Sequence, residues 1–241
     1  MKVYRKSLVA AALVVCMALG MTGCGSEPLD GKQIAATVGE TEMTLGEANF
    51  LLRYQQVQTE SYYESMLGEG IYEMDLYGTG ATYAEDFKAS IMDQMQEYYI
   101  MEAKAADYGV ALTEEDTAAI AEAAAKFLSD NDANTKEQMT ADQETVEKVL
   151  TLITVGMKTS NAVVAEANIT LTEEEIAEAE AAAAEAEEET EADLESLLQT
   201  KQSEYYNEVM SGWKAEYPLT VEEAVWAEVK FNNSYELVTA E

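Results

Sequence analysis

The chain has 241 residues, and its 47 Asp and Glu residues against 14 Lys and Arg residues give a net charge of −33 at neutral pH. This charge excludes nucleic acid as a partner, because binding it requires cationic side chains that neutralise the phosphates. The chain contains no histidine, which excludes Ser-His-Asp and Cys-His catalysis and zinc sites built on histidine. We therefore expect no catalytic residue, no metal and no cofactor, and we do not expect an enzyme.

The first 23 residues have the pattern of a secretory signal peptide. Three basic residues precede an uncharged apolar run over residues 8–19, which is too short to span a bilayer. The segment ends in Met21-Thr22-Gly23-Cys24, which resembles the bacterial lipobox, with Met where Leu is usual. The resemblance implies cleavage before Cys24 and attachment of diacylglycerol and palmitate to that residue.

We therefore predict a lipoprotein that is held at the extracytoplasmic face of the cell membrane by lipid on Cys24. The other cysteine, Cys16, lies in the segment that cleavage removes, so the mature domain has no internal disulfide. Residues 1–23 are the signal peptide and residues 24–32 form the lipidated tether. Residues 33–241 are expected to fold as one helical domain.

After the tether, the sequence predicts a short strand and then a helix. Residues 33–38 alternate weakly and contain Ile and Val, which favours a strand that turns at Gly39. Thr44 and Glu47 have the spacing of a capping box, in which each side chain accepts a hydrogen bond from the backbone amide of the other residue. They predict the start of an amphipathic helix that ends near Gly68.

Three further helices are predicted in the middle of the chain. Thr82 and Glu85 form a second capping-box pattern, and the helix that they begin ends at Gly109. A Leu-Thr pair followed by three acidic residues begins a helix over residues 113–128. Apolar residues at helical spacing predict a longer helix over residues 141–167.

The last third of the chain begins with an unusual segment. Residues 176–191 are almost only Ala and Glu, which predicts a highly charged helix. Residues 194–209 restore an apolar stripe at helical spacing, and residues 227–231 are predicted to be a strand. A strand near each end of the domain predicts a small two-stranded sheet that joins the N- and C-terminal segments of a mainly α fold.

Tyrosine doublets and methionines indicate a candidate binding surface. Met adapts to irregular apolar surfaces, and Tyr supplies amphipathic contact area. Because neighbouring residues on a helix are turned by about 100°, only one ring of each doublet can point along the core-facing stripe. The alternative that these side chains belong to the core remains open. The candidate residues are Tyr62, Tyr63, Met66, Met92, Met95, Tyr98, Tyr99, Met101, Tyr205 and Tyr206.

Several segments resemble the SurA/PrsA-type extracytoplasmic foldases. Residues 34–40, Ile-Ala-Ala-Thr-Val-Gly-Glu, and residues 43–48, Met-Thr-Leu-Gly-Glu-Ala, are similar to the opening of that family, although its Asn is not kept. Residues 103–116 are similar to the next signature, a helix that ends in Gly and a β-branched residue before Thr-acid-acid. Residues 213–231 are similar to the closing helix and strand.

The resemblance implies a chaperone module that lacks the family's parvulin prolyl-isomerase domain, because the Ala/Glu-rich run of residues 176–191 stands where that domain would be inserted. The expected fold is a multi-helix chaperone cradle. The expected function is binding of apolar segments of unfolded, newly exported polypeptides without ATP, with the Tyr and Met residues above as the client-binding side chains. Two alternatives remain open: a peptidyl-prolyl cis-trans isomerase by family association, and a surface lipoprotein adaptor with one dedicated partner.

Overall fold

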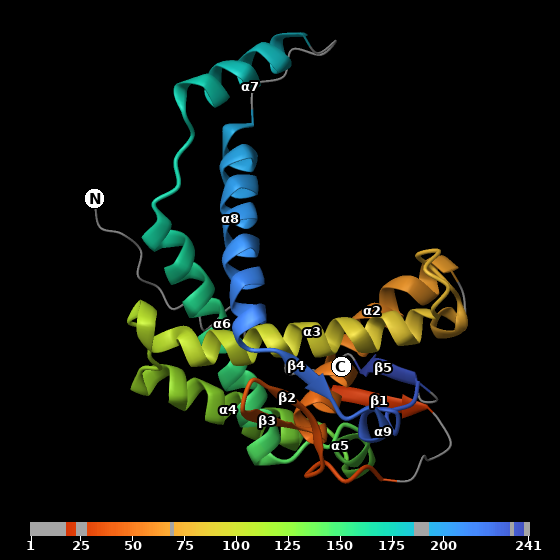
Figure 1. Cartoon of the computed structure of the whole chain (residues 1–241). Helices are drawn as coiled ribbons and strands as arrows, with labels where there is room; N and C mark the ends of the chain where they lie inside the picture. Colours follow the sequence, from red (N-terminus) through yellow and green to blue (C-terminus); the bar gives the residue numbers. More distant parts are fainter. Residues whose placement is uncertain (1–17, 23–27, 68–69, 186–192, 232–233, 239–241) are drawn as a thin grey trace.

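The computed structural model describes residues 18–22, 28–67, 70–185, 193–231 and 234–238 (Figure 1). Side chains are placed for residues 28–59, 70–184 and 193–231. The described part of the chain is mainly helical, which confirms the predicted fold class. Its elements are β1 (Ala18–Thr22), β2 (Ile34–Val38), β3 (Thr41–Thr44), α2 (Leu45–Leu67), α3 (Tyr83–Lys104), α4 (Glu114–Asp130), α5 (Ala133–Gln138), α6 (Gln143–Ala167), α7 (Glu173–Glu185), α8 (Leu194–Glu216), β4 (Leu219–Val221), α9 (Glu223–Trp226) and β5 (Ser234–Val238).

The sheet that joins the two ends of the domain has three antiparallel strands in the order β3-β2-β4, so the prediction of two strands is wrong. The expected joining of N- and C-terminal segments is present, because β2 pairs with β4 with Ala36 opposite Val221. The strand β3 was missed because it is the second strand of a tight hairpin that turns at Gly39, where φ is +59°.

Residues 227–231, which were predicted to be the second strand, do not pair in this sheet. Their backbone carbonyls accept hydrogen bonds from side chains instead: Lys88 Nζ donates to Val229 O at 3.0 Å, and Arg53 Nη2 donates to Lys230 O at 2.6 Å. The ring of Phe231 lies 4.4 Å from the ring of Tyr72, between centroids. This segment therefore packs its apolar side chains against helices α2 and α3 without forming a ladder.

The predicted helix starts are correct where a capping box was found. Thr82 Oγ1 accepts from the backbone amide of Glu85, and the Glu85 carboxylate accepts from the backbone amide of Thr82 at 2.7 Å. The same exchange joins Thr44 and Glu47 at the start of α2. These motifs are local, so the sequence alone determines them.

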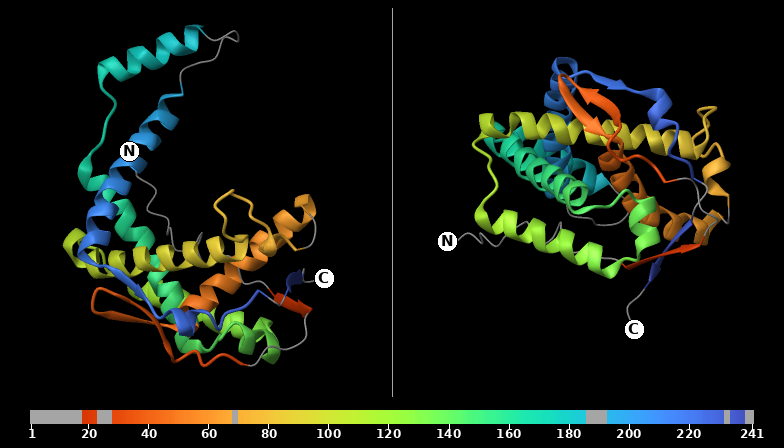
Figure 2. Two further views of the ribbon diagram at one scale, coloured as in Figure 1. Left: turned by 45° about the vertical axis from the view of Figure 1, so that its right-hand side comes forward. Right: turned by 90° about the horizontal axis from the view of Figure 1, so that it is seen from below.

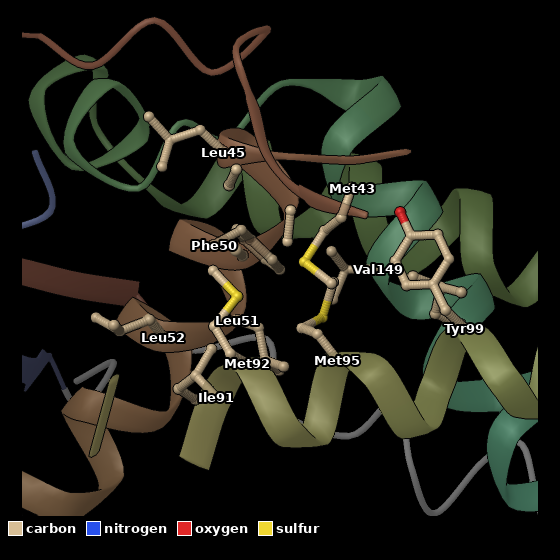
Figure 3. Close-up of a cluster of buried hydrophobic side chains, with 14 of the residues drawn as sticks. Met43, Leu45, Phe50, Leu51, Leu52, Ile91, Met92, Met95, Tyr99 and Val149 are labelled. Atoms are coloured by element: carbon tan, nitrogen blue, oxygen red, sulfur yellow. The ribbon is translucent and has the colours of Figure 1, made fainter. Parts of the chain in front are cut away.

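The core lies between the sheet and helices α2, α3 and α6. Figure 3 shows side chains from β3, α2 and α3 interdigitating, with Val149 of α6 beside them. The largest fully buried apolar side chains are Met43, Leu45, Leu51, Leu52, Ile71, Ile91, Met95, Ile100, Met139, Leu152 and Val38. The sheet and these three helices form the globular part of the fold, which we call the base.

Helices α3 and α6 approach closely at Gly156. A Cβ atom added there would lie 3.0 Å from Cδ1 of Tyr98 and 3.1 Å from Cε of Met101. We predict that Gly156→Leu lowers the free energy of unfolding by about 1–3 kcal/mol, because the added side chain overpacks this crossing. Chemical denaturation measures the change. The matched control is Gly212→Leu on α8, where an added Cβ meets no atom within 4 Å; the higher helix propensity of Leu should leave stability equal or raised. Equal losses in both variants would contradict the prediction.

Part of the chain projects from this base as an arm. Figures 1 and 2 show α8 rising steeply from α3, with α7 at the far end and the C-terminal part of α6 beside the lower part of α8. The root of α8 is held by buried Met210 and Trp213, and Lys214 Nζ lies 2.7 Å from Asp93 and 2.8 Å from Glu97 on α3. We call residues 164–209 the arm.

The strand β1 belongs to the segment that was predicted to be a signal peptide. It pairs antiparallel with β5, with Ala18 opposite Val238 and Thr22 opposite Ser234, as a two-stranded sheet separate from β3-β2-β4. This pairing was not expected from the sequence. Cleavage before Cys24, which stays a prediction, removes β1 from the chain and takes away the partner that β5 has in the full-length structure.

Candidate functional site

The arm has no core of its own. Among the described side chains of residues 164–184 and 193–209, none is buried, whereas the flanking residues Val163 and Met210 are. A helical segment of this length normally gains its stability by burying an apolar face. The apolar side chains of the arm are therefore only partly covered by the fold.

Apart from Val209, seven Val, Leu and Ile side chains of the arm are half-buried. They do not belong to the core cluster or to the partly buried side chains that pack against it. Three of them come from the N-terminal turns of α8, and the others come from the end of α6, the following loop and α7. They are Val164, Ile169, Leu171, Ile176, Leu194, Leu197 and Leu198. We call these seven half-buried side chains, which are spread along the arm, the arm ridge.

The arm is also strongly acidic. Residues 164–209 contain fifteen Asp and Glu residues and one basic residue, Lys201. Lys201 Nζ lies 2.7 Å from Oε1 of Glu175 and 3.2 Å from the carbonyl oxygen of Thr170, so it ties α8 to the start of α7. The carboxylate of Glu175 also accepts hydrogen bonds from the backbone amide and hydroxyl of Thr172, which cap α7.

These contacts predict a pH dependence of the arm. The hydrogen bond from Lys201, followed by those from Thr172, lowers the pKa of Glu175 from 4.5 to about 2. Because the folded-state pKa lies below the unfolded value, the stabilising contribution is complete above pH 4.5 and is lost as the pH falls from 4.5 to 2. We expect the contact between α7 and α8 to loosen in that window, which the chemical shifts of Thr172 and Glu175 amides report.

Two variants distinguish the effect of the Lys201–Glu175 contact from a general loosening of the protein at low pH. Glu175→Gln should loosen the start of α7 already at neutral pH and remove the transition between pH 4.5 and 2. Glu174→Gln, at an exposed neighbouring position, should leave the transition in place. An unchanged transition in the Glu175→Gln variant would count against the assignment.

A cleft of about 640 Å³ lies between the C-terminal part of α6 and the middle of α8. Its lining contains five amide side chains, two serines and one tyrosine, with Val164, Ala165 and Ile169 as apolar residues. No charged residue lines it, although it lies within the most acidic part of the chain. The polar lining residues are Ser160, Asn161, Asn168, Gln199, Gln202, Ser203, Tyr206 and Asn207. We call this space the amide cleft.

Four of the predicted binding residues are core residues, so their proposed contact with a client is wrong for this structure. The exposed fractions are 3% for Met92, 0% for Met95, 4% for Tyr99 and 4% for Met101. Figure 3 shows Met92, Met95 and Tyr99 pointing from α3 into the core. The Tyr99 hydroxyl donates to the carboxylate of Glu47 at 2.9 Å, and burial, with Glu47 beside it, raises the pKa of Tyr99.

The other predicted tyrosines lie at the root of the arm. Tyr98, Tyr205 and Tyr206 are half-buried and pack against the core. The hydroxyl of Tyr206 donates to Sδ of Met101 at 3.2 Å, and burial raises the pKa of Tyr206 to about 12. Of these three tyrosines, only Tyr206 also lines the amide cleft.

The remaining three predicted residues, Tyr62, Tyr63 and Met66, lie outside the residues whose side chains the structure describes. Two surface side chains near that end of α2 are not among the candidate residues given above. Met74 is 40% exposed and Tyr77 is 62% exposed, in the loop between α2 and α3. Tyr77 borders a group of rings that contains Tyr83, 6.0 Å away between centroids.

A larger cleft of about 890 Å³ lies beside the starts of α2 and α6, and four of its charged side chains already take part in holding the fold. Glu47 caps α2 and accepts from Tyr99, and Asp142 caps α6. Lys148 pairs with Glu102, and Lys136 donates to the carbonyl oxygen of Leu128. These contacts serve to hold the helix ends, so we do not place the functional site here.

Other kinds of site are reported for the described residues only. They contain no group of three or more His, Cys, Asp or Glu side chains placed to hold a metal ion. No helix in the described ranges combines the length and the apolar character that crossing a membrane requires. In comparisons with known proteins, no family model, no curated protein and no solved structure matches the chain.

Proposed function

We propose that this chain is a membrane-anchored, extracytoplasmic chaperone that binds apolar segments of unfolded exported proteins without ATP. The observation that carries the proposal is the arm: a helical projection without a buried side chain among its described residues, with seven half-buried aliphatic side chains along it. A client segment that packs on the arm ridge covers apolar surface that the fold leaves partly open.

The size of this surface suits reversible binding. Completing the burial of a half-covered Leu or Ile contributes on the order of 1 kcal/mol. Seven such side chains contribute on the order of 5–10 kcal/mol, and association costs about 4–15 kcal/mol in lost freedom. Because the gain and the cost are of similar size, we expect weak binding, which allows a client to leave and fold. The acidic side chains around the ridge keep the complex soluble and favour clients with basic residues.

The resemblance to the SurA/PrsA-type foldases supports the same proposal. The segments that carry the resemblance form β2, the start of α2, the end of α3 and the returning segment that includes β4. The Ala/Glu-rich run, where that family carries its isomerase domain, is occupied by α7 as far as Glu185. The chain is therefore proposed to keep the holding function of the family without the isomerase.

The test is suppression of aggregation. Chemically unfolded citrate synthase is diluted into buffer with the mature chain, which begins at residue 24 and carries Cys24→Ser to keep it unlipidated, and light scattering is followed without ATP. We expect clear suppression at near-equal molar ratio. No suppression up to a several-fold excess would refute the proposal.

Two further measurements separate the alternatives. A chromogenic peptide assay that shows isomerisation above background would favour a prolyl isomerase. A pull-down from the native envelope that returns one stoichiometric partner, in place of many exported proteins, would favour a dedicated adaptor.

A further inference from the structure

The amide cleft has a composition that the proposed function leaves unexplained. It contains hydrogen-bonding side chains without charge in a segment with fifteen acidic residues. An uncharged lining is less suited to a phosphate or a metal ion, because charged ligands bind such groups more strongly. Each amide side chain instead offers two N–H donors and one carbonyl acceptor. The chemistry of the cleft therefore matches a neutral ligand that is rich in both donors and acceptors.

The amides of the cleft are not used to hold the fold. Within the described part of the chain, the side chains of Asn161, Gln199, Gln202 and Asn207 make no hydrogen bond to another protein group, and three of them are exposed to solvent. The same is true of the side chain of Asn168, which ends α6 in the left-handed conformation with φ of +48°. Asn tolerates this conformation better than most residues, and its position there turns the chain at the edge of the cleft.

We propose that the amide cleft binds the main chain of an extended polypeptide segment, so that it recognises peptide groups and not particular side chains. This inference rests on the proposed function and names how the client is held. Each residue of an extended segment carries one N–H donor and one C=O acceptor, spaced at about 3.3 Å per residue. The volume of about 640 Å³ lies within the range of ligand sites, roughly 300–1,000 Å³.

The apolar residues beside the amides support a peptide over a sugar. Val164 and Ile169 line the cleft and belong to the arm ridge, so a bound segment can place its amides in the cleft and its apolar side chains on the ridge. Sugar sites commonly use an open aromatic face. The one aromatic residue of the lining, Tyr206, is half-buried and its hydroxyl is bonded to Met101.

The test compares two fluorescent nonapeptides of the same uncharged sequence, with apolar and polar residues in alternation. One has an ordinary backbone, and the other is N-methylated at alternate residues, which removes half of its N–H donors. The protein is the mature chain with Cys24→Ser, and fluorescence anisotropy gives the dissociation constants. We expect N-methylation to weaken binding at least tenfold.

Variants of the lining residues test whether the peptide binds in the amide cleft. Gln199→Met with Gln202→Met keeps the shape of the side chains and removes their hydrogen bonds. This double variant should bind the ordinary peptide about tenfold more weakly and should weaken the N-methylated peptide less, because that peptide has already lost half of its N–H donors. The matched control is Gln58→Met at an exposed position on α2, which should change neither.

Three outcomes would overturn the inference: equal binding of both peptides, an unchanged double variant, or displacement of the ordinary peptide by chitotetraose at a lower concentration than by unlabelled peptide. The last would assign the cleft to a sugar. Aggregation assays on the same preparation keep the two proposals apart. Suppression that persists without an N-methylation effect overturns only the main-chain inference, whereas absent suppression overturns the chaperone function.

Discussion

Replacement of Leu194, Leu197 and Leu198 by Gln is expected to raise the concentration of protein needed to suppress aggregation at least tenfold. These side chains lie on the first turns of α8 and contribute three of the seven members of the arm ridge. Losing a contribution on the order of 1 kcal/mol at each of the three positions is enough to weaken client binding by more than tenfold. Gln is chosen because its helix propensity is close to that of Leu, so α8 should remain helical.

The same triple variant should remain folded. None of the three leucines is buried or packs against the core, and surface substitutions away from the core usually change stability little. The matched control is Leu152→Ala, at a fully buried position of α6. It should lower the free energy of unfolding by about 2–5 kcal/mol and retain suppression below its melting temperature. Full suppression by the triple variant would mean that the ridge is not the binding surface.

The helix starts were predictable from the sequence because their determinants are local. The capping boxes at Thr44 and Thr82 use side chains three residues apart, and both form as expected. The sheet was predicted less well because β3 was missed and because residues 227–231 were expected in place of β4 as the partner of β2. Leu219–Val221 has only three residues, and its pairing with β2 is decided by where α8 ends. No local pattern of that length separates a strand from a loop.

The candidate site shows more clearly that helical spacing of apolar residues does not predict which of them are buried. An apolar stripe at 3.6-residue spacing looks the same in sequence whether another helix covers it or not. On α3 the stripe is covered by α2 and α6, so Met92, Met95 and Tyr99 are buried. On α8 the stripe is buried only near the C-terminal end of the helix, at Met210 and Trp213. The leucines of its first turns are half-buried. Which stripe remains open depends on the path of the whole chain.

Replacement of Cys24 by Ala is expected to move nearly all of the protein from the membrane fraction to the soluble fraction and to abolish incorporation of radioactive palmitate. One acyl chain gives only marginal membrane binding, and stable anchoring takes more than one chain or signal. The lipid proposed on Cys24 carries several. No helix among the described residues is able to replace it as a membrane-spanning anchor.

The second cysteine of the chain supplies the control for this experiment. Cys16 lies in the apolar run of the predicted signal peptide, so Cys16→Ala should keep both the label and the membrane location. N-terminal sequencing or mass measurement of the wild-type protein should find that residues 1–23 are absent, and with them β1. Palmitate that remains on the Cys24→Ala variant, or a mature chain that still contains β1, would contradict the lipoprotein assignment. The latter result would make the β1–β5 pair part of the working protein, with Ala18–Thr22 as a structural strand.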